Sequence, residues 1–342
     1  MPVSAPEQPA DPGAVRAQLL DMLAGFLRTQ ALHTVARLGV ADIVGDRPVP
    51  IEELAAQVGA EPSALLRVMR MLAGVGVFLE AAPRAFVATP LSDGMREDRP
   101  YSVRYMAMQQ GTPAYLAASE MLECVRTGEP AAERVLGLPM FEYLAEDPER
   151  SEIFNRAMAG GARASAAAAL EYDWSEASVV ADIGGGSGSL LSAVLNANPH
   201  LRGVVFDLPQ VVEAARPAIE AAGLSDRCEI VGGDFFADAL PSADVYVLAR
   251  ILHDWNDEKA VAILANCRRC IADGGRLLVL EQVLPEGDEP SYGRLLDLIM
   301  LVMLGGKERT AGEWRDLLAN GGFELVSAIP GAVTGLIEAV PR

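Results

Sequence analysis

The sequence predicts two domains, a mainly helical N-terminal domain and a C-terminal α/β domain built on a parallel sheet. Three observations support this prediction. Two short helices and two short strands follow one another within residues 50–88, and strands and helices alternate from Val179 onwards. A Gly-x-Gly-x-Gly turn begins at Gly184, directly after the first strand of that alternation. We assign residues 14–100 to the first domain and 101–342 to the second.

Length and composition limit the possible classes of function. The 342 residues include 28 basic and 47 acidic ones, and the net charge of −19 argues against nucleic acid or an anionic membrane as a partner. Hydrophobic residues make up 51% of the chain, which is typical of a globular protein. No apolar run reaches the roughly 18 residues of a membrane span, and residues 1–13 do not resemble a secretion signal. We therefore expect a cytoplasmic protein.

The four cysteines are expected to be reduced thiols. Cys267 and Cys270 have the Cys-x-x-Cys spacing of redox and zinc motifs. They fall late in an expected helix, Glu258–Ile271, with no second Cys or His pair nearby. We therefore expect no metal.

The order of elements within residues 50–88 is typical of a winged helix. A DNA-binding regulator is therefore an alternative for the first domain. The expected recognition helix, residues 62–72, carries only Arg67 and Arg70, and the whole chain is acidic. Both facts disfavour DNA.

An apolar stripe precedes this winged helix. Within the one or two helices expected at residues 14–42, Leu19, Leu23, Phe26 and Leu27 fall on one face. Exposed stripes of this kind usually meet a partner, and symmetric pairing is the commonest way to bury them. We predict a homodimer built through the N-terminal module; the alternative is a helix packed wholly on its own subunit.

Residues 101–170 are expected to be helical and are rich in Met, Tyr and Phe. Such residues usually form a core. Beside a ligand-binding domain, some of them would also line a flat apolar pocket.

The second domain is predicted to contain a parallel sheet that ends in an antiparallel hairpin, because its last two strands are linked by a short connection at Pro330-Gly331. The predicted strands are Val179–Ile183, Gly203–Asp207, Cys228–Val231, Asp244–Leu248, Arg276–Glu281, Phe323–Ala328 and Thr334–Val340. The carboxyl ends of the parallel strands meet at one edge, where α/β domains bind their ligands. The glycine turn and the start of the helix expected at residues 189–196 lie at that edge.

Three acidic residues occur at or just after the ends of the first three strands: Asp182, Asp207 and Asp234. Asp207 is suited to accept hydrogen bonds from ribose hydroxyls, and Asp234 from an adenine amino group beside Phe235. The acids would repel a phosphate group, and no P-loop lysine is present. These residues predict a nucleoside ligand rather than a nucleotide.

Five motifs together resemble those of the class I S-adenosylmethionine-dependent methyltransferases, and specifically the small-molecule O-methyltransferases that include the plant caffeate and isoflavone enzymes. The motifs are Asp182-Ile183-Gly184-Gly185-Gly186-Ser187-Gly188, Asp207-Leu208-Pro209, Gly233-Asp234-Phe235-Phe236, His253-Asp254-Trp255 and Gly305-Gly306-Lys307-Glu308-Arg309-Thr310. The resemblance runs from about Ala14 to the C-terminus, and bacterial relatives that tailor aromatic polyketides are similar in length. It implies a winged-helix dimerisation domain and a Rossmann-like domain whose seven-stranded sheet has an antiparallel last strand pair. It also implies S-adenosylmethionine as cofactor, S-adenosylhomocysteine as product and no metal.

The resemblance and the glycine edge together assign ten residues to the cofactor. They are Asp182, Gly184, Gly186, Asp207, Leu208, Asp234, Phe235, Ala249, Arg250 and Trp255. Ala249 departs from the family, which often has a Lys there, so any contact at Ala249 would come from its backbone.

His253 is expected to be the general base, because it lies just past the carboxyl end of the fourth strand. A phenol with a pKa near 10 is ionised to only roughly one part in a thousand at neutral pH. A positioned imidazole that removes its proton is worth about 10²–10⁴-fold in rate.

The resemblance pairs His253 with two flanking acids, Glu281 and Glu308, which would fix its tautomer and stabilise the imidazolium. The alternative for Glu281 is a helix or loop cap, and for Glu308 a salt bridge to Arg309 or Lys307. Asp254 is expected to face away from His253, where it would cap the helix that opens at Asp257 or, as the alternative, contact the cofactor.

Seven residues are expected to contact an aromatic acceptor: Phe154, Met158, Asp254, Asp297, Met300, Met303 and Leu304. The resemblance points to the first two, and the last four share one helix face. Leu304 stands where the plant enzymes often have Asn, so the acceptors of those enzymes are in doubt for this chain.

The sequence therefore predicts an S-adenosylmethionine-dependent O-methyltransferase that methylates a phenolic hydroxyl of an aromatic small molecule, in bacterial natural-product biosynthesis. The resemblance also implies that the partner's N-terminus closes part of the acceptor pocket. Two alternatives stay open: a winged-helix regulator that binds the cofactor without catalysis, and a relative that performs N-methylation, hydroxylation or decarboxylation.

Overall fold

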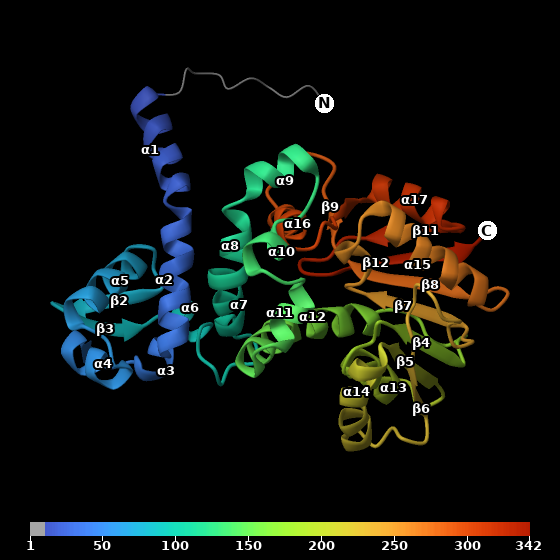
Figure 1. Ribbon diagram of the computed structural model, residues 1–342. Coiled ribbons are helices and arrows are strands. Elements are labelled where there is room, and N and C mark those ends of the chain that lie inside the picture. The colour runs from blue at the N-terminus through green and yellow to red at the C-terminus, as the bar shows by residue number, and fades with distance from the viewer. Residues whose placement is uncertain (1–10) are drawn as a thin grey trace. The chain divides into compact units, whose positions relative to one another are not determined.

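The computed structural model describes residues 11–342, which form two compact units (Figure 1). The first unit runs to Tyr115 and includes Pro148–Ala157; the second comprises Leu116–Asp147 and Met158–Arg342. Residues 1–10, most of the segment compared above with a secretion signal, lie outside the described residues. Within residues 11–342, no helix is both long and apolar enough to span a lipid bilayer.

The first unit has the predicted order of a winged helix. Its elements are α1 (Pro12–Leu23), α2 (Gly25–Leu38), α3 (Val40–Ile43), β1 (Val49–Pro50), α4 (Ile51–Val58), α5 (Pro62–Gly74), β2 (Phe78–Ala82), β3 (Ala85–Ala88), α6 (Pro90–Asp93), α7 (Arg104–Gln109) and a π-helical turn, η1 (Gln110–Ala114). The strands form an antiparallel sheet in the order β1-β3-β2, so the predicted wing gains one short strand.

Helix α5 illustrates how local sequence sets these elements. The Glu61 carboxylate accepts hydrogen bonds from the backbone N–H groups of Ser63 and Ala64, and Pro62 occupies the first turn, where its missing N–H costs nothing. Leu65, Met69 and Leu72 are spaced so that they point to one side, where they are buried. The predicted helix at residues 62–72 is confirmed.

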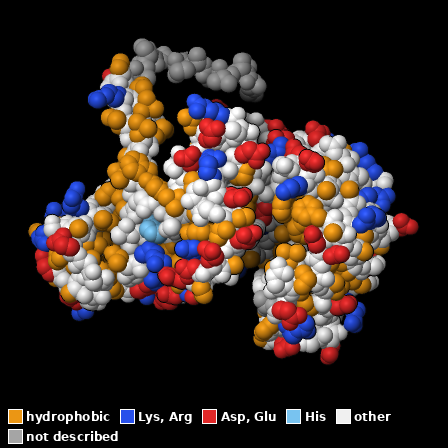
Figure 2. All heavy atoms as spheres, in the orientation of Figure 1, with side chains coloured by type: hydrophobic (Ala, Val, Ile, Leu, Met, Phe, Trp, Pro, Cys, Tyr) orange, Lys and Arg blue, Asp and Glu red, His pale blue; other side chains and the backbone are white. Residues whose placement is uncertain are grey.

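The apolar stripe on α1 and α2 is exposed. Leu19 and Leu23 are 55% and 70% exposed, and Phe26 and Leu27 are more than half exposed as well. Figure 2 shows hydrophobic side chains along this helical segment. The structure contains no buried residue in α1, which contradicts the alternative of a helix packed wholly on its own subunit.

The double substitution Leu19→Glu, Leu23→Glu is expected to convert the dimer to a monomer, because it places two charges in the apolar surface that a second copy must cover. Light scattering of the full-length chain measures the change. Leu79→Glu, at an equally exposed leucine of the wing, is the control. A truncation up to Asp42 is unsuitable because Val35 and Ala36 of α2 belong to the core of the unit. A double variant that stays dimeric contradicts the prediction.

The segment between the wing and the sheet is helical, as predicted. It contains α8 (Tyr115–Ala118), α9 (Met121–Thr127), α10 (Ala132–Leu136), α11 (Met140–Ala145) and α12 (Pro148–Leu170). Helix α12 contributes residues to both units, since the first unit takes Pro148–Ala157 and the second begins again at Met158.

The second unit is built on a seven-stranded sheet in the order β11-β12-β8-β7-β4-β5-β6. Its strands are β4 (Val179–Ile183), β5 (Arg202–Asp207), β6 (Cys228–Gly232), β7 (Val245–Ala249), β8 (Arg276–Glu281), β11 (Phe323–Ile329) and β12 (Gly335–Pro341). The strands β4 to β8 pair in parallel, whereas β12 is antiparallel to both of its neighbours. The predicted hairpin is confirmed. Two short strands, β9 (Val283–Leu284) and β10 (Arg309–Thr310), form a separate parallel pair.

Helices cover both faces of this sheet (Figure 1). They are α13 (Ser189–Ala197), α14 (Pro209–Ala221), α15 (Asp257–Cys270) and α17 (Ala311–Asn320), whereas α16 (Tyr292–Met303) contacts α9 and β9. Alternate residues of each strand enter different cores: Ala181 and Ile183 of β4 pack with α15 and α17, and Val180 packs with α13 and α14. The carboxyl ends of β4, β5, β6 and β7 therefore form one edge of a rigid scaffold.

Candidate active site

The turn after β4 requires glycine. Gly184, Gly186 and Gly188 have φ values of +76°, +54° and +69°, which side chains rarely tolerate. A Cβ atom at Gly184 would collide with Ile251, whereas nothing lies within 4 Å of a Cβ at Gly186. The predicted glycine turn is present, and its backbone is open to close approach at Gly186.

The acid at the end of β5 holds this turn. The carboxylate of Asp207 accepts hydrogen bonds from the backbone N–H of Gly186 at 2.9 Å and of Leu208 at 2.7 Å. Burial raises the pKa of Asp207, and the two N–H donors oppose that rise. Asp207 therefore joins the glycine turn to the start of α14.

Asp182 lies beneath the turn rather than at its surface. It is 1% exposed, and a Cβ atom at Gly185 would lie 2.9 Å from its carboxyl group. Burial, and then the charge of Asp207, raise the pKa of Asp182 to about 7. The structure shows that Asp182 packs closely under Gly185. Its direct contact with a cofactor stays a prediction.

Three aromatic rings gather after β6 and β7. The ring centroid of Phe236 lies 4.9 Å from that of Phe235 and 5.0 Å from that of Trp255, with steep interplanar angles. Phe235 and Trp255 are among the predicted cofactor residues, whereas no role is predicted for Phe236. The side chain of Asp234 accepts from the N–H of Phe236 at 2.8 Å and so fixes this segment.

Asp207→Ala is expected to weaken the binding of S-adenosylhomocysteine by at least about tenfold, because hydrogen bonds to a charged group are worth about 1.5–3 kcal/mol. Titration calorimetry measures this affinity, and thermal unfolding checks that the turn survives. Asp226→Ala removes an exposed acid from the loop before β6 and is the control. Equal affinity in Asp207→Ala and wild type means that the ribose assignment is wrong.

His253 is buried in the short 3₁₀ turn η2 (Leu252–Asp254) that follows β7. Its Nδ1 lies 2.7 Å from Oε1 of Glu308. Its Nε2 lies 3.4 Å from Oδ1 of Asp254. The expectation that Asp254 faces away and caps the next helix is therefore wrong, because Asn256 supplies that cap by accepting from the N–H of Lys259.

Glu281, at the end of β8, binds the loop backbone rather than the imidazole. Its carboxylate accepts from the N–H groups of Ile251 at 3.0 Å, Leu252 at 2.7 Å and His253 at 3.1 Å, and it stays 3.9 Å from Nδ1. Glu281 therefore serves as the loop cap of the alternative, and its charge also lies beside the imidazole, as the resemblance implies. Glu281 is a positioning residue for the loop that carries His253.

Glu308 pairs with the histidine, as the resemblance implies. Lys307 and Arg309 pair with Asp257 instead, so the alternative of a salt bridge from Glu308 to either of them is wrong. The backbone N–H of Glu308 is in turn held by the carboxylate of Asp297 at 2.9 Å. Asp297, expected to contact an acceptor, therefore anchors the residue that orients His253.

Burial opposes a charge on His253, but the surrounding acids outweigh it. Burial alone would lower the pKa of His253, while Glu281, Asp254 and Glu308 raise it, and the net result is about 9. The imidazole is therefore protonated at neutral pH in the protein without ligands.

Two further positioning residues were missed by sequence reasoning. Arg309 is fully buried and donates to the carbonyl oxygens of Leu252 at 3.3 Å and Trp255 at 3.2 Å, and to Asp257 at 2.8 Å. Gly306 lies so close to this loop that a Cβ atom would collide with the carbonyl oxygen of His253. Both belong to the motif Gly305 to Thr310. The motif indicates where the site lies, but it does not show that these two residues position the His253 loop.

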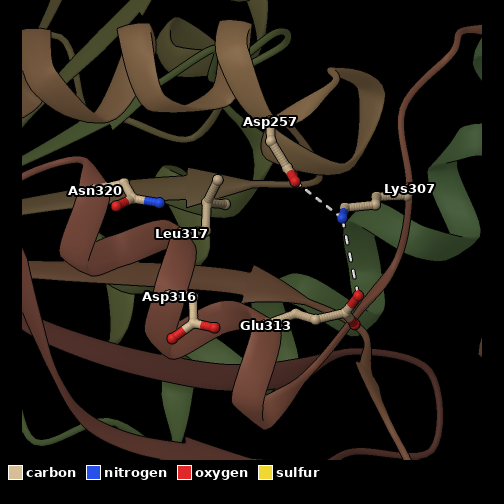
Figure 3. A pocket seen from close by; sticks show the side chains of 6 residues that line it. All are labelled: Asp257, Lys307, Glu313, Asp316, Leu317 and Asn320. Atoms are coloured by element: carbon tan, nitrogen blue, oxygen red, sulfur yellow. Dashed lines mark ion pairs between the residues drawn. The ribbon is translucent and has the colours of Figure 1, made fainter.

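A polar recess of about 150 Å³ lies beside Lys307 (Figure 3). Its lining residues are Asp257, Lys307, Glu313, Asp316, Leu317 and Asn320. The Lys307 ammonium lies 3.0 Å from Asp257 and 3.8 Å from Glu313, so the recess is bridged by ion pairs. None of the predicted cofactor or acceptor residues lines it.

Ligand atoms of His253, Glu281 and Glu308 lie within 4.8 Å of one another, a spacing that would permit a metal ion. In this structure the three residues have protein partners: Glu281 accepts from three backbone N–H groups, and Nδ1 of His253 pairs with Oε1 of Glu308. The arrangement is that of a hydrogen-bond network, and the expectation of a metal-free site stays a prediction.

The remaining predicted contacts come from several elements. Met300 and Met303 are buried in α16, and Leu304 follows that helix. Leu208 is exposed before α14, and Ala249 ends β7. Phe154 belongs to the first unit and Met158 to the second. Their contacts with ligands stay predictions.

Comparisons with known proteins agree with this geometry. A family model described as an O-methyltransferase domain matches residues 119–324, and one described as an O-methyltransferase dimerisation domain matches residues 20–97. The chain is 46% identical to the phenazine O-methyltransferase PhzM of Lysobacter antibioticus, across 94% of this chain and 95% of that one. It is 36% identical to the aclacinomycin 10-hydroxylase RdmB of Streptomyces purpurascens, across 96% and 90% of the two chains.

One solved structure among those similar to this chain contains two ligands. It is the O-methyltransferase NcsB1 from neocarzinostatin biosynthesis, in complex with S-adenosylmethionine and 2-hydroxy-5-methyl naphthoic acid. The TM-score is 0.80 at 35% identity, and the match covers 92% of this chain and 96% of that one.

Proposed function

This chain belongs to the S-adenosylmethionine-dependent O-methyltransferases of bacterial natural-product biosynthesis, and from that membership we propose that it methylates a phenolic hydroxyl with His253 as general base. It carries the family's dimerisation domain and is a homodimer. The proposal concerns the acceptor and the base, which family membership alone does not give.

The residues at the sheet edge suit the cofactor. Gly186 leaves its backbone open, Asp207 has carboxylate oxygens for ribose hydroxyls, and Phe235, Phe236 and Trp255 offer ring faces and edges for adenine. When bound, S-adenosylmethionine supplies a methyl group on an activated sulfonium. The protein must then hold the acceptor in line and take up its proton.

One observation carries the proposal: the buried pair of His253 and Glu308 leaves Nε2 as the nitrogen that can receive a proton. The acceptor hydroxyl donates its proton to neutral Nε2, and Glu308, Asp254 and Glu281 stabilise the imidazolium that forms. The pKa of His253, about 9, lies close to that of a phenol, near 10, so the transfer is nearly balanced.

The acceptor class follows from the relatives and from α16. PhzM acts on a phenazine, and NcsB1 binds a naphthoic acid, both planar fused aromatics. Met300 and Met303 are apolar side chains on the helix before the Glu308 loop. We propose a planar hydroxylated aromatic acceptor, with aromatic acids among the candidates.

The test is a turnover screen with S-adenosylmethionine and three acceptors: 1-hydroxyphenazine, 1,4-dihydroxy-2-naphthoic acid and 3-amino-4-hydroxybenzoic acid. We expect a product that gains one methyl group on oxygen. The relation to RdmB makes hydroxylation the outcome to look for as the alternative. A gain of oxygen, or a methyl group on nitrogen, overturns the proposal.

The rate should rise steeply with pH. Because the pKa of His253 is raised to about 9, the neutral base is scarce below that pH and grows about tenfold per unit as the pH approaches it. We expect log kcat/KM for the acceptor to rise with a slope near one between about pH 6.5 and 8.5. S-adenosylmethionine is kept well above its KM at every pH. Affinity for S-adenosylhomocysteine over the same range is the control. A flat profile contradicts the assignment of His253.

A further inference from the structure

Arg250 has a strained backbone. It lies between β7 and η2, and its φ of +59° is in the left-handed region that non-glycine residues avoid. Its N–H donates to the carbonyl oxygen of Leu280 at 3.2 Å, and Glu281 holds the next three N–H groups. The loop is therefore fixed on both sides of Arg250, and its fixed backbone determines where the side chain goes.

The side chain of Arg250 lies against Gly161 of α12. A Cβ atom at Gly161 would lie 3.0 Å from Cζ, Nε and Nη1 of Arg250, so the guanidinium occupies the space that a side chain would take. At the preceding position, Gly160, the nearest neighbour of such a Cβ is Arg163, at 4.0 Å. Both glycines are in the same helix, but only Gly161 makes room for Arg250.

The guanidinium has no partner within residues 11–342: it makes neither a hydrogen bond nor an ion pair there, although acidic residues outnumber basic ones 47 to 28. The contrast with Arg309 is direct, because Arg309 is satisfied by carbonyl groups and Asp257. The N–H donors of this half-buried guanidinium are therefore not used by the protein and can serve a ligand.

Arg250 is close enough to the site to act on its electrostatics. Burial raises the pKa of Asp254, while the charges of His253 and Arg250 oppose that rise. Asp254 lies beside Nε2 of His253. The unpaired guanidinium thus belongs to the surroundings of the proposed base.

We propose that Arg250 binds a ligand carboxylate at the methyl-transfer site, through the paired N–H groups of its guanidinium. Arginine presents a planar fork that matches a carboxylate with two parallel hydrogen bonds. Two sources share this chemistry: the amino-acid carboxylate of the cofactor and the carboxylate of an aromatic acid acceptor. The role rests on the function proposed above, but binding measurements test it without turnover.

The cofactor arm compares S-adenosylhomocysteine with its decarboxylated analogue, S-adenosyl-3-thiopropylamine, which keeps the amine. If Arg250 binds the cofactor carboxylate, Arg250→Gln weakens S-adenosylhomocysteine by about tenfold or more in calorimetry and leaves the analogue unchanged. Arg202→Gln, which removes an exposed arginine at the opposite edge of the sheet, is the charge control.

The acceptor arm compares 1,4-dihydroxy-2-naphthoic acid with its methyl ester, both titrated into protein saturated with S-adenosylhomocysteine. If Arg250 binds the acceptor carboxylate, Arg250→Gln weakens the acid by about tenfold or more and leaves the ester unchanged.

Gly161→Ala provides a second variant that keeps the arginine. The added methyl group makes the flexible guanidinium shift by a few tenths of an ångström, while alanine favours the helix. We expect a smaller loss than in Arg250→Gln, again selective for the carboxylate ligand and without a lower melting temperature. Gly160→Ala makes the same helix change without the contact and should bind like wild type.

Two results overturn the proposal. One is that Arg250→Gln binds every carboxylate probe as tightly as wild type does. If the naphthoic acid does not bind to wild type, unchanged affinity for S-adenosylhomocysteine alone has the same meaning. The other is an equal loss for each carboxylate ligand and its matched analogue. Selective loss in either arm supports the proposal even if His253 proves not to be the base, because neither arm depends on catalysis.

Discussion

His253→Ala is expected to lower turnover at neutral pH by about 10²-fold or more, since it removes the proposed base for the acceptor proton. Affinity for S-adenosylhomocysteine should change little, because the imidazole is bound to Glu308 and not to the glycine turn. Raising the pH should partly restore turnover, because solvent then ionises the phenol without help from a base.

The matched control is His200→Ala. His200 is the histidine of the turn before β5, where its Nε2 lies 3.1 Å from the carbonyl oxygen of Trp174. Steady-state rates and calorimetry on both variants separate loss of the base from general damage. Undiminished turnover in His253→Ala would mean that proximity alone drives the reaction and that His253 is structural.

The fold was predictable because its signals are local. Continuous apolar runs and a short connection that contains Pro330-Gly331 indicate the strands and the hairpin. The limits of elements were less accurate. Asp244, predicted to begin a strand, instead accepts hydrogen bonds from the N–H groups of Ser178 and Val179 at 2.8 and 2.9 Å, and β7 begins one residue later. Such a side-chain bond to a distant segment leaves no local pattern.

The position of the site in the fold could be predicted from the sequence, but the roles of its individual residues could be predicted only in part. The motif around His253 fixes its position at the sheet edge, yet motif spacing cannot say which way Asp254 points. A 3₁₀ turn brings that carboxylate to Nε2, and Glu281 is taken by backbone N–H groups of the same loop. The helix face of Asp297 predicts an acceptor contact, which stays a prediction, but it does not reveal that Asp297 accepts from the N–H of Glu308, across the turn after α16.

Gly306 packs against the backbone of the His253 loop so closely that a substitution there is expected to have a large effect. A Cβ atom there would collide with the carbonyl oxygen of His253 and lie 2.5 Å from the carbonyl carbon of Asp254 and 2.7 Å from the N atom of Trp255. All three are backbone atoms that cannot rotate away. Ordinary contacts between such atoms need about 3.5 Å, so Gly306→Ala must displace the His253 loop or the Glu308 segment by at least about 1 Å.

A shift of that size separates the base from its acceptor, and a misplacement of about 1 Å can cost about 10²-fold in rate. We therefore expect Gly306→Ala to lower kcat by about that factor, with a smaller change in the KM for S-adenosylmethionine. The slope of log kcat/KM against pH should also flatten, because a displaced imidazole no longer limits the reaction. Gly287→Ala is the control, since nothing lies within 4 Å of a Cβ at that position. An unchanged kcat with an unchanged pH profile would show that the loop absorbs the methyl group and that the close packing of Gly306 does not position His253.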